Sequence, residues 1–369
     1  MTVALEGRID IRLRRVGDAA PSVEIRSSRP QLAQKLMAGR TPDAAADMAG
    51  LLFSLCGKAQ RIAALAACEA ARGQTLPDEV AGQRERDVLV ELAQEHAWRL
   101  LLNWPEQAGR SPDMPSLLLL RQSSGEPERF ANTLENLLGA VLLGESPEQW
   151  LARDLTGFDL WRRAGLTLVA KLFADLGDGP DPGASHGALL PALADLDDAA
   201  ARELAGRALA EPAFCATPTW QDAPAETGAL ARAGNQPPLA AWIARRGRGA
   251  GARLLARLLE LAELPQRLGA EAGSGGRARV VRSWALSENL GMAGVETSRG
   301  LLIHVVRLNE GKVADYRIIA PTEWNFHPAG PLAQALAGLG PGAGLEAVAR
   351  LVSQSLDPCV AYGVELIDA

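Results

Sequence analysis

Two cysteines, Cys56 and Cys359, are the residues of this chain best suited to bind a metal. Cys56 precedes Gly57 and an alanine-rich segment of strong helix formers, which places its sulfur near the N-terminus of a predicted helix. The helix dipole there favours thiolate, which is the form of cysteine that binds metals. Cys68 lies twelve residues later, about 18 Å along a continuous helix, and cannot share an ion with Cys56. A second ligand must therefore come from elsewhere in the chain.

Cysteine usage and composition exclude several classes of protein. The four cysteines form no Cys-x-x-Cys pair, so neither a ready-made zinc site nor a disulfide framework is indicated. Cys68 and Cys215 lie in apolar surroundings and are interpreted as inert core residues. The net charge of −6 gives the whole chain no electrostatic affinity for nucleic acid. Because no long apolar run and no N-terminal signal are present, we expect a cytoplasmic protein.

Hydrophobic periodicity predicts a mainly α protein with small β elements, which is an α+β chain. Alternating apolar and polar residues predict an N-terminal β-hairpin within residues 1–28. Residues 29–270 are rich in helix formers and predict a central helix bundle. Gly-rich segments at 177–187 and 271–276 predict loops.

The last segment, residues 277–369, predicts a mixture of strand and helix. Two apolar stretches flank Asn-Glu-Gly-Lys at 309–312 and predict a C-terminal β-hairpin. A helix over about 344–356 should then deliver the chain to Asp357.

Short motifs spread over the whole chain, in a fixed order, carry a family resemblance. The chain is similar to the large subunit of nickel-iron hydrogenases, which implies that fold, as a single domain over residues 1–369. The matching motifs are Gly-Arg-Thr-Pro-Asp-Ala at 39–44, Leu-Cys-Gly at 55–57, Glu-Thr-Ser-Arg-Gly-Leu-Leu-Ile-His at 296–304, Pro-Thr-Glu-Trp-Asn at 321–325 and Asp-Pro-Cys at 357–359.

The resemblance implies a set of site residues. Cys56 and Cys359 match the first cysteine in each of the family's two cysteine pairs. Arg299 matches the arginine that faces the cyanide ligands of the iron, a role that suits its permanent charge and five fixed donors. Asp357 matches the carboxylate beside the metal pocket, whereas His304 is expected to be a structural residue rather than a ligand.

Other positions depart from the family pattern. Ala59 and Tyr362 replace the second cysteines, and Ala63 and Glu365 replace the histidines that follow them. Gln34 stands where the active enzymes carry a glutamate thought to relay protons. Both bridging thiolates are thus absent, which argues against nickel-iron catalysis. The retained pair aligns with positions that bind nickel only, so the resemblance leaves open whether one or both hold iron.

This pattern of losses resembles the HupK/HoxV-type hydrogenase expression/formation proteins, which are shortened homologues of the large subunit. The resemblance implies a non-catalytic maturation scaffold that transiently holds an Fe(CN)2(CO) unit on Cys56 and Cys359, with no nickel. Expected partners are a HypC-type small chaperone, other maturation factors and the hydrogenase large subunit or its precursor. Two alternatives remain open: a degenerate enzyme or hydrogen sensor with a modified metal centre, and a metal-free protein that organises maturation chaperones.

Overall fold

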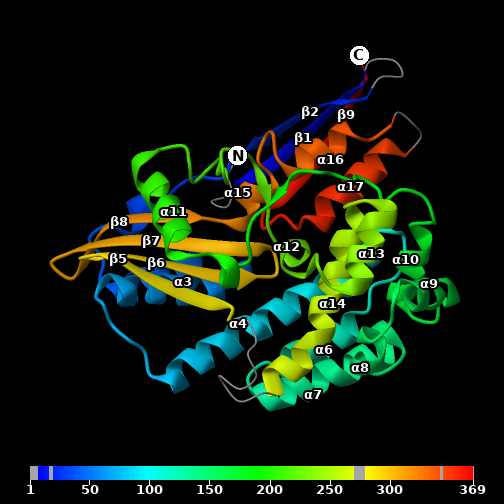
Figure 1. The fold of residues 1–369 in the computed structure, drawn as a ribbon, viewed down its shortest axis with the longest axis horizontal. Helices are drawn as coiled ribbons and strands as arrows, with labels where there is room; N and C mark the ends of the chain where they lie inside the picture. Colours follow the sequence, from blue (N-terminus) through cyan, green and yellow to red (C-terminus); the bar gives the residue numbers. More distant parts are fainter. Residues whose placement is uncertain (1–6, 16–19, 270–278, 341–343, 369) are drawn as a thin grey trace.

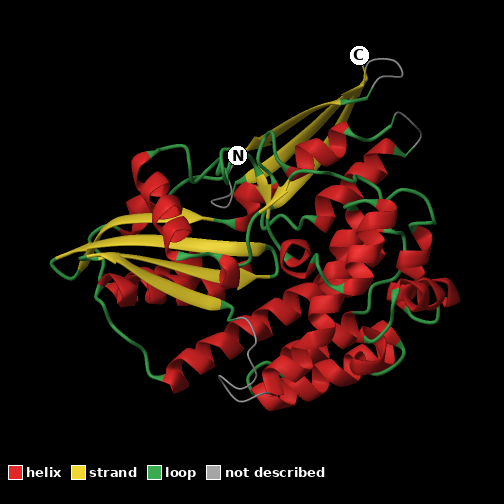
Figure 2. Cartoon of the chain, in the orientation of Figure 1, coloured by secondary structure: helices red, strands yellow, loops and turns green. Residues whose placement is uncertain are grey.

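The computed structural model describes residues 7–15, 20–269, 279–340 and 344–368. The predicted loop at 271–276 therefore lies outside the described residues, as does the start of the first predicted strand. The described residues include a four-stranded sheet and a smaller three-stranded sheet, which lie beside a large group of helices (Figure 1). Helices make up most of the chain, as Figure 2 shows, so the predicted α+β class is confirmed.

The smaller sheet joins the two ends of the chain. Strands β1 (Arg8–Arg15) and β2 (Ser22–Ser27) form the predicted N-terminal hairpin. Strand β9 (Ala361–Asp368) adds to β1 in parallel, giving the order β2-β1-β9. This strand was not expected, because its pairing depends on a partner from the opposite end of the chain. The sheet packs on α16 (Pro331–Ala337) and α17 (Leu345–Ser355) and so anchors the segment that follows Asp357.

The larger sheet is antiparallel, with the order β5-β6-β7-β8. The predicted C-terminal hairpin is its β7–β8 pair, and the sheet is wider than expected because β5 and β6 precede that hairpin. Helix α3 packs on one face and α11 on the other. The bounds are β5 Val281–Ser287, β6 Leu290–Thr297, β7 Gly300–Asn309, β8 Lys312–Ile319, α3 Gly57–Ala71 and α11 Asp198–Ala210.

One close approach fixes α3 on this sheet. A Cβ atom added to Gly291, in β6, would lie 2.2 Å from the carbonyl oxygen of Ala67 and 2.4 Å from the amide nitrogen of Ala71. Only glycine leaves room for the helix at that distance. Helix α3 carries Cys56 at its start, so this contact also fixes the height of the cysteine above the sheet.

The helical part is built around α4 and α14, which cross its centre (Figure 1). Its helices enclose a large apolar core of alanine, leucine and aromatic side chains. Among the described residues, no helix is both long and apolar enough to cross a membrane. The remaining bounds are α1 Ala33–Met37, α2 Pro42–Leu52, α4 Asp78–Trp98, α5 Trp104–Gln107, α6 Met114–Gln122, α7 Pro127–Leu137, α8 Pro147–Leu151, α9 Leu155–Ala164, α10 Leu168–Asp175, β3 Ala188–Leu189, β4 Ala225–Glu226, α12 Ala229–Ala233, α13 Pro237–Arg246, α14 Ala250–Gly269 and α15 Pro321–Asn325.

Candidate metal-unit pocket

Cys56 lies at the N-cap of α3, where the sequence predicts it. Its Sγ accepts a hydrogen bond from Gln60 Nε2 at 3.7 Å, one turn along the same helix. Burial nevertheless raises the pKa of the Cys56 thiol to about 12, with Arg299 lowering it and Glu91 raising it further. The expected preference for thiolate is therefore not met in the metal-free protein, because desolvation outweighs the helix dipole. A metal that binds here must displace the thiol proton.

Cys359 reaches the same place from the other end of the chain. It lies in the short connection between α17 and β9. Thr322, in α15, donates its hydroxyl to Cys359 Sγ at 3.1 Å. Each of the two cysteines is thus contacted by a separate neutral donor.

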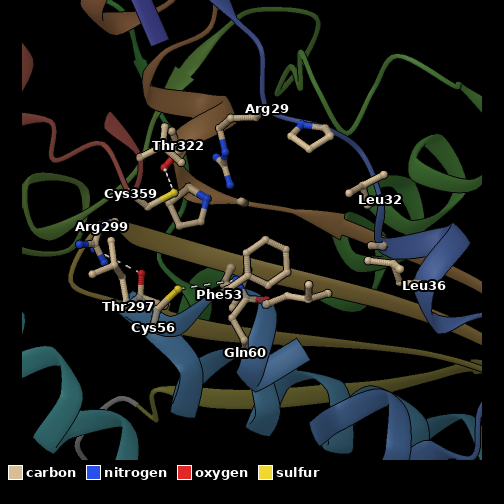
Figure 3. Close-up of a pocket in the computed structure, with 18 residues that line it drawn as sticks. Arg29, Leu32, Leu36, Phe53, Cys56, Gln60, Thr297, Arg299, Thr322 and Cys359 are labelled. Atoms are coloured by element: carbon tan, nitrogen blue, oxygen red, sulfur yellow. Dashed lines mark hydrogen bonds between the residues drawn. The ribbon is translucent and has the colours of Figure 1, made fainter. Parts of the chain in front are cut away.

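The two sulfurs line one pocket, which Figure 3 shows with their side chains facing it from different elements. The cavity measures about 90 Å³, several times the ~10–15 Å³ that one water molecule requires. Its walls are mostly apolar, with a few polar groups. The polar groups of the lining include Arg29, Gln60, Thr297, Arg299 and Thr322.

Arg299 enters this pocket from a tight turn. The two residues between β6 and β7, Ser298 and Arg299, form a hairpin turn closed by the pair Thr297 and Gly300. Thr297 Oγ1 accepts a hydrogen bond from the Arg299 amide at 3.2 Å, and Asn325 Nδ2 donates to the Arg299 carbonyl at 3.2 Å. The backbone that carries the guanidinium is therefore held on both sides.

The Arg299 guanidinium is buried and only partly paired. Its Nη2 donates to Glu95 Oε2 at 2.6 Å, and its Nε lies 3.2 Å from Asp357 Oδ1. Burial alone would lower the pKa of Arg299, but the carboxylates of Asp357 and Glu95 hold it above the ordinary value. Within the part of the chain that the structure describes, the buried Nη1 has no hydrogen-bond partner. This atom is a donor available to a bound group.

Asp357 is fully buried among three arginines. Besides Arg299, it pairs with Arg257 at 3.3 Å and with Arg99, which lies in the π-helical segment Arg99–Asn103. Burial alone would raise the pKa of Asp357, but these three cations hold it well below its ordinary range. Its φ of +57° makes the sharp bend that turns the chain toward Cys359. Asp357 therefore positions both Arg299 and the cysteine segment.

A second arginine, Arg29, was not singled out from the sequence. It lines the pocket and pairs with the buried Glu323 at 2.7 Å. Burial alone would lower its pKa, but Cys359, Glu323 and Cys56 raise it above the ordinary value. Two guanidinium groups thus face two sulfurs. Gln60 could have been found from its i, i+4 spacing to Cys56, whereas Arg29 and Thr322 approach only through the fold.

Four residues stand where the family carries a cysteine or histidine, and each has a structural role here. Ala59 and Ala63 lie on the buried face of α3 and pack in the core. Tyr362 lies in β9 opposite Ile9, and Glu365 forms an exposed ion pair with Arg12 at 3.1 Å.

Gln34 does not line the pocket. Its Oε1 accepts from the Tyr316 amide at 2.5 Å, and its Nε2 donates to the Ala314 carbonyl at 3.2 Å, which attaches α1 to β8. Cys68 and Cys215 are buried away from the pocket. Among the described residues, no group of three or more His, Cys, Asp or Glu side chains could hold a metal ion. Cys56 and Cys359 are therefore the two sulfur donors that the pocket offers.

A larger groove, lined by both apolar and charged side chains, adjoins the pocket. It has a volume of about 840 Å³ and shares Leu55, Arg299, Cys359 and Val360 with the pocket. Four of its side chains are large, apolar and exposed: Leu55, Trp98, Met114 and Leu118. Cys359 can thus be approached from the surface along this groove.

Comparison with known proteins identifies relatives of the whole chain. A family described as nickel-dependent hydrogenase matches residues 247–365, which include Arg299, Asp357 and Cys359. The hydrogenase expression/formation protein HoxV of Cupriavidus necator is 33% identical, and the match covers 100% of this chain and 97% of that protein. The hydrogenase expression/formation protein HupK of Azotobacter vinelandii is 31% identical, over 99% of this chain and 100% of that protein.

Solved structures share the fold at low sequence identity. The Ni-Fe-Se hydrogenase from Desulfovibrio vulgaris Hildenborough superposes with a TM-score of 0.60 at 15% identity, covering 93% of this chain and 94% of that one. The Ni-Fe-Se hydrogenase from Desulfomicrobium baculatum gives a TM-score of 0.59 at 15% identity, covering 94% and 95%. The predicted hydrogenase large-subunit-like fold is confirmed.

Proposed function

Because the chain belongs to the HoxV/HupK family of hydrogenase expression/formation proteins, we propose that it is a non-catalytic accessory protein in nickel-iron hydrogenase maturation. In this proposal it transiently holds an Fe(CN)2(CO) unit through the thiolates of Cys56 and Cys359. The unit is cargo, which then passes to the hydrogenase large subunit. No nickel takes part.

The observation that carries the proposal is the pairing of two thiols with two guanidinium groups in one pocket. Cys56 and Cys359 offer sulfur, and Arg29 and Arg299 offer charge and hydrogen-bond donors. Thiolates suit iron, whereas guanidinium suits anionic acceptors such as metal-bound cyanide. The unpartnered Arg299 Nη1 supplies one such donor without breaking an existing hydrogen bond. The apolar remainder of the pocket suits carbon monoxide, which makes weak hydrogen bonds.

The small number of protein donors supports transient holding. Two thiolates leave the iron's other positions to its own diatomic ligands, so release requires the breaking of two protein bonds. Deprotonation of Cys56 also has a free-energy cost, since burial raises the pKa of its thiol to about 12. Reprotonation of this thiol therefore favours departure of the cargo.

The exposed apolar side chains of the groove support an encounter with protein partners. Exposed apolar patches beside a ligand site are typical of protein interaction surfaces. A partner seated over Trp98, Met114 and Leu118 would lie next to Cys359. We propose that a HypC-type small chaperone delivers the iron unit and that the hydrogenase large-subunit precursor receives it, both acting at this face.

Infrared spectroscopy with iron analysis tests the function. The tagged full-length chain would be purified from cells that express the hydrogenase maturation genes, alongside Cys56→Ser, Cys359→Ser and the matched control Cys68→Ser. We expect cyanide and carbonyl bands with bound iron in the wild type and Cys68→Ser, and their loss in both pocket variants. Iron-free wild-type protein without these bands, in cells with full hydrogenase activity, would instead favour the metal-free organiser of chaperones.

A further inference from the structure

Two packed helices, α4 and α6, line the groove beside the pocket. The lining includes positions 91, 94, 95 and 98 of α4, and positions 114, 117, 118 and 121 of α6. Both sets follow the i, i+3, i+4, i+7 spacing, which gathers side chains on one face of a helix. Two such rows leave a channel into which the side-chain ridge of a third helix packs. The groove therefore has the form of a binding site for an amphipathic helix.

The groove also concentrates exposed apolar surface. Of the described residues, nine large apolar side chains are exposed, and four of these line this one groove. Trp98, on α4, is 40% exposed, and Leu118, on α6, is 53% exposed. A helix that lies between the two walls buries both side chains. Aromatic side chains buried in this way are typical of the few residues that dominate binding at protein interfaces.

Arg121 gives the groove a charge preference. The other charged side chains of the lining are already paired or hydrogen-bonded within the protein, and they are Glu91, Glu95, Arg99 and Arg299. Arg121 is exposed, and its guanidinium has neither an ion pair nor a hydrogen bond with any residue that the structure describes. A partner that covers Arg121 removes water from this charge, which costs free energy unless the partner supplies a carboxylate. The same charge repels a basic segment.

We propose that the groove binds an amphipathic helix of the delivering chaperone, with apolar side chains against Trp98 and Leu118 and a carboxylate against Arg121. The proposal rests on the proposed function, in which this chaperone brings the iron unit, and it names the chemistry of the docking segment. Cys359 lines the same groove. The bound helix therefore covers the approach to this sulfur from the surface while the unit is transferred.

Isothermal titration calorimetry of the full-length chain with the purified HypC-type chaperone tests the proposal. Trp98→Ala should weaken binding about 30-fold, as expected for an aromatic anchor. Arg121→Glu should weaken it about tenfold or more, whereas Arg121→Lys keeps the charge and should weaken it less. Arg307→Glu is the matched control, because Arg307 is exposed on β7 and lies outside the groove, so the affinity should not change.

Charge exchange between the two proteins gives the more specific readout. Each acidic residue on the helices of the chaperone would be changed in turn to lysine. One of these variants should bind Arg121→Glu more tightly than the unchanged chaperone does, a rescue that a merely structural role of Arg121 would not produce. Added salt should weaken binding by the wild type, and Arg121→Gln should reduce this salt dependence. Hydrogen exchange should show protection of α4, α6 and one helix of the chaperone in the complex.

Several results would overturn the proposal. One is a chaperone that does not bind the wild type, and another is an affinity that Trp98→Ala and Arg121→Glu leave unchanged. A third is a wild type that sediments as a dimer when these two variants are monomers, because the occupant is then a second copy of the chain. Should Trp98→Ala not fold, Leu118→Ser replaces it.

Failure of the docking proposal can be told apart from failure of the proposed function. Cyanide and carbonyl bands in the wild type, with an affinity that the groove variants do not change, would retain the carrier and reject the docking helix. Weakened affinity in the groove variants, with a wild type that never binds iron, would retain the docking helix and reject the carrier.

Discussion

Arg299 Nε lies 3.2 Å from Asp357 Oδ1, which joins the turn between β6 and β7 to the bend that precedes Cys359. Neither residue has substantial exposure: Arg299 is 3% exposed and Asp357 fully buried. The pair therefore links the turn that carries the Arg299 guanidinium to the segment that carries Cys359. Removing one partner of such a buried pair leaves the other charge without compensation.

Asp357→Asn should destabilise the protein by about 3–5 kcal/mol, because the buried Arg257 and Arg299 and the partly buried Arg99 would lose their carboxylate. The measurement is the free energy of unfolding from urea denaturation. Glu365→Gln is the matched control, since it breaks an exposed ion pair with Arg12 and should cost less than about 1 kcal/mol. Equal effects of the two substitutions would contradict a central structural role for Asp357.

The sequence predicts the local elements that carry Cys56 and Arg299, but not the side chains that the fold brings to them from distant parts of the chain. The N-cap position of Cys56 follows from a local pattern of helix formers, and the hairpin turn that carries Arg299 from local strand patterns. Pairing of β9 with β1, by contrast, joins residues more than 340 positions apart and has no local signature. The approach of Arg29 to the sulfurs depends on that long-range packing and could not be read from spacing.

The same distinction applies to energetics. Sequence identifies the helix N-terminus that favours a thiolate, but burial depends on the surrounding elements. Because those elements desolvate Cys56, its pKa moves to about 12 rather than below its ordinary value.

Gly291→Ala should destabilise the protein by about 1–3 kcal/mol, because the new methyl group would collide with the backbone of α3. The shift of α3 should also reduce the iron bound per chain, since Cys56 starts that helix. Thermal and urea unfolding, with iron analysis, measure both effects.

Gly206→Ala controls for the loss of a glycine. Gly206 lies in α11 with open space around its Cβ position, so alanine should stabilise this helix by up to ~1 kcal/mol. If Gly206→Ala destabilised the protein as much as Gly291→Ala, the close contact of Gly291 with α3 would not be the cause of the loss.

Glu91 should make stability depend on pH. Its carboxylate accepts from the amides of Lys58 at 2.8 Å and Ala59 at 3.0 Å. Burial raises its pKa to about 7, from an unfolded value of 4.5, and Glu95 adds to the rise. The folded state therefore binds more protons than the unfolded state between these values, so stability is lost as pH rises from about 4.5 to 7.

Glu91→Gln keeps an oxygen acceptor but does not titrate. As pH rises from about 4.5 to 7, the unfolding free energy of the wild type should fall by about 2–3 kcal/mol relative to that of Glu91→Gln. Urea denaturation at several pH values measures it. Parallel stability curves for the two proteins would contradict the raised pKa.

The most direct test of the central claim is the number of sulfur ligands on the bound iron, measured by X-ray absorption at the iron edge. The iron-loaded wild type should show two sulfur neighbours per iron, from Cys56 and Cys359. Any iron retained by Cys359→Ser should show one, and Cys68→Ser should match the wild type. Iron without sulfur neighbours, or a sulfur count that Cys56→Ser and Cys359→Ser leave unchanged, would contradict the two-thiolate carrier.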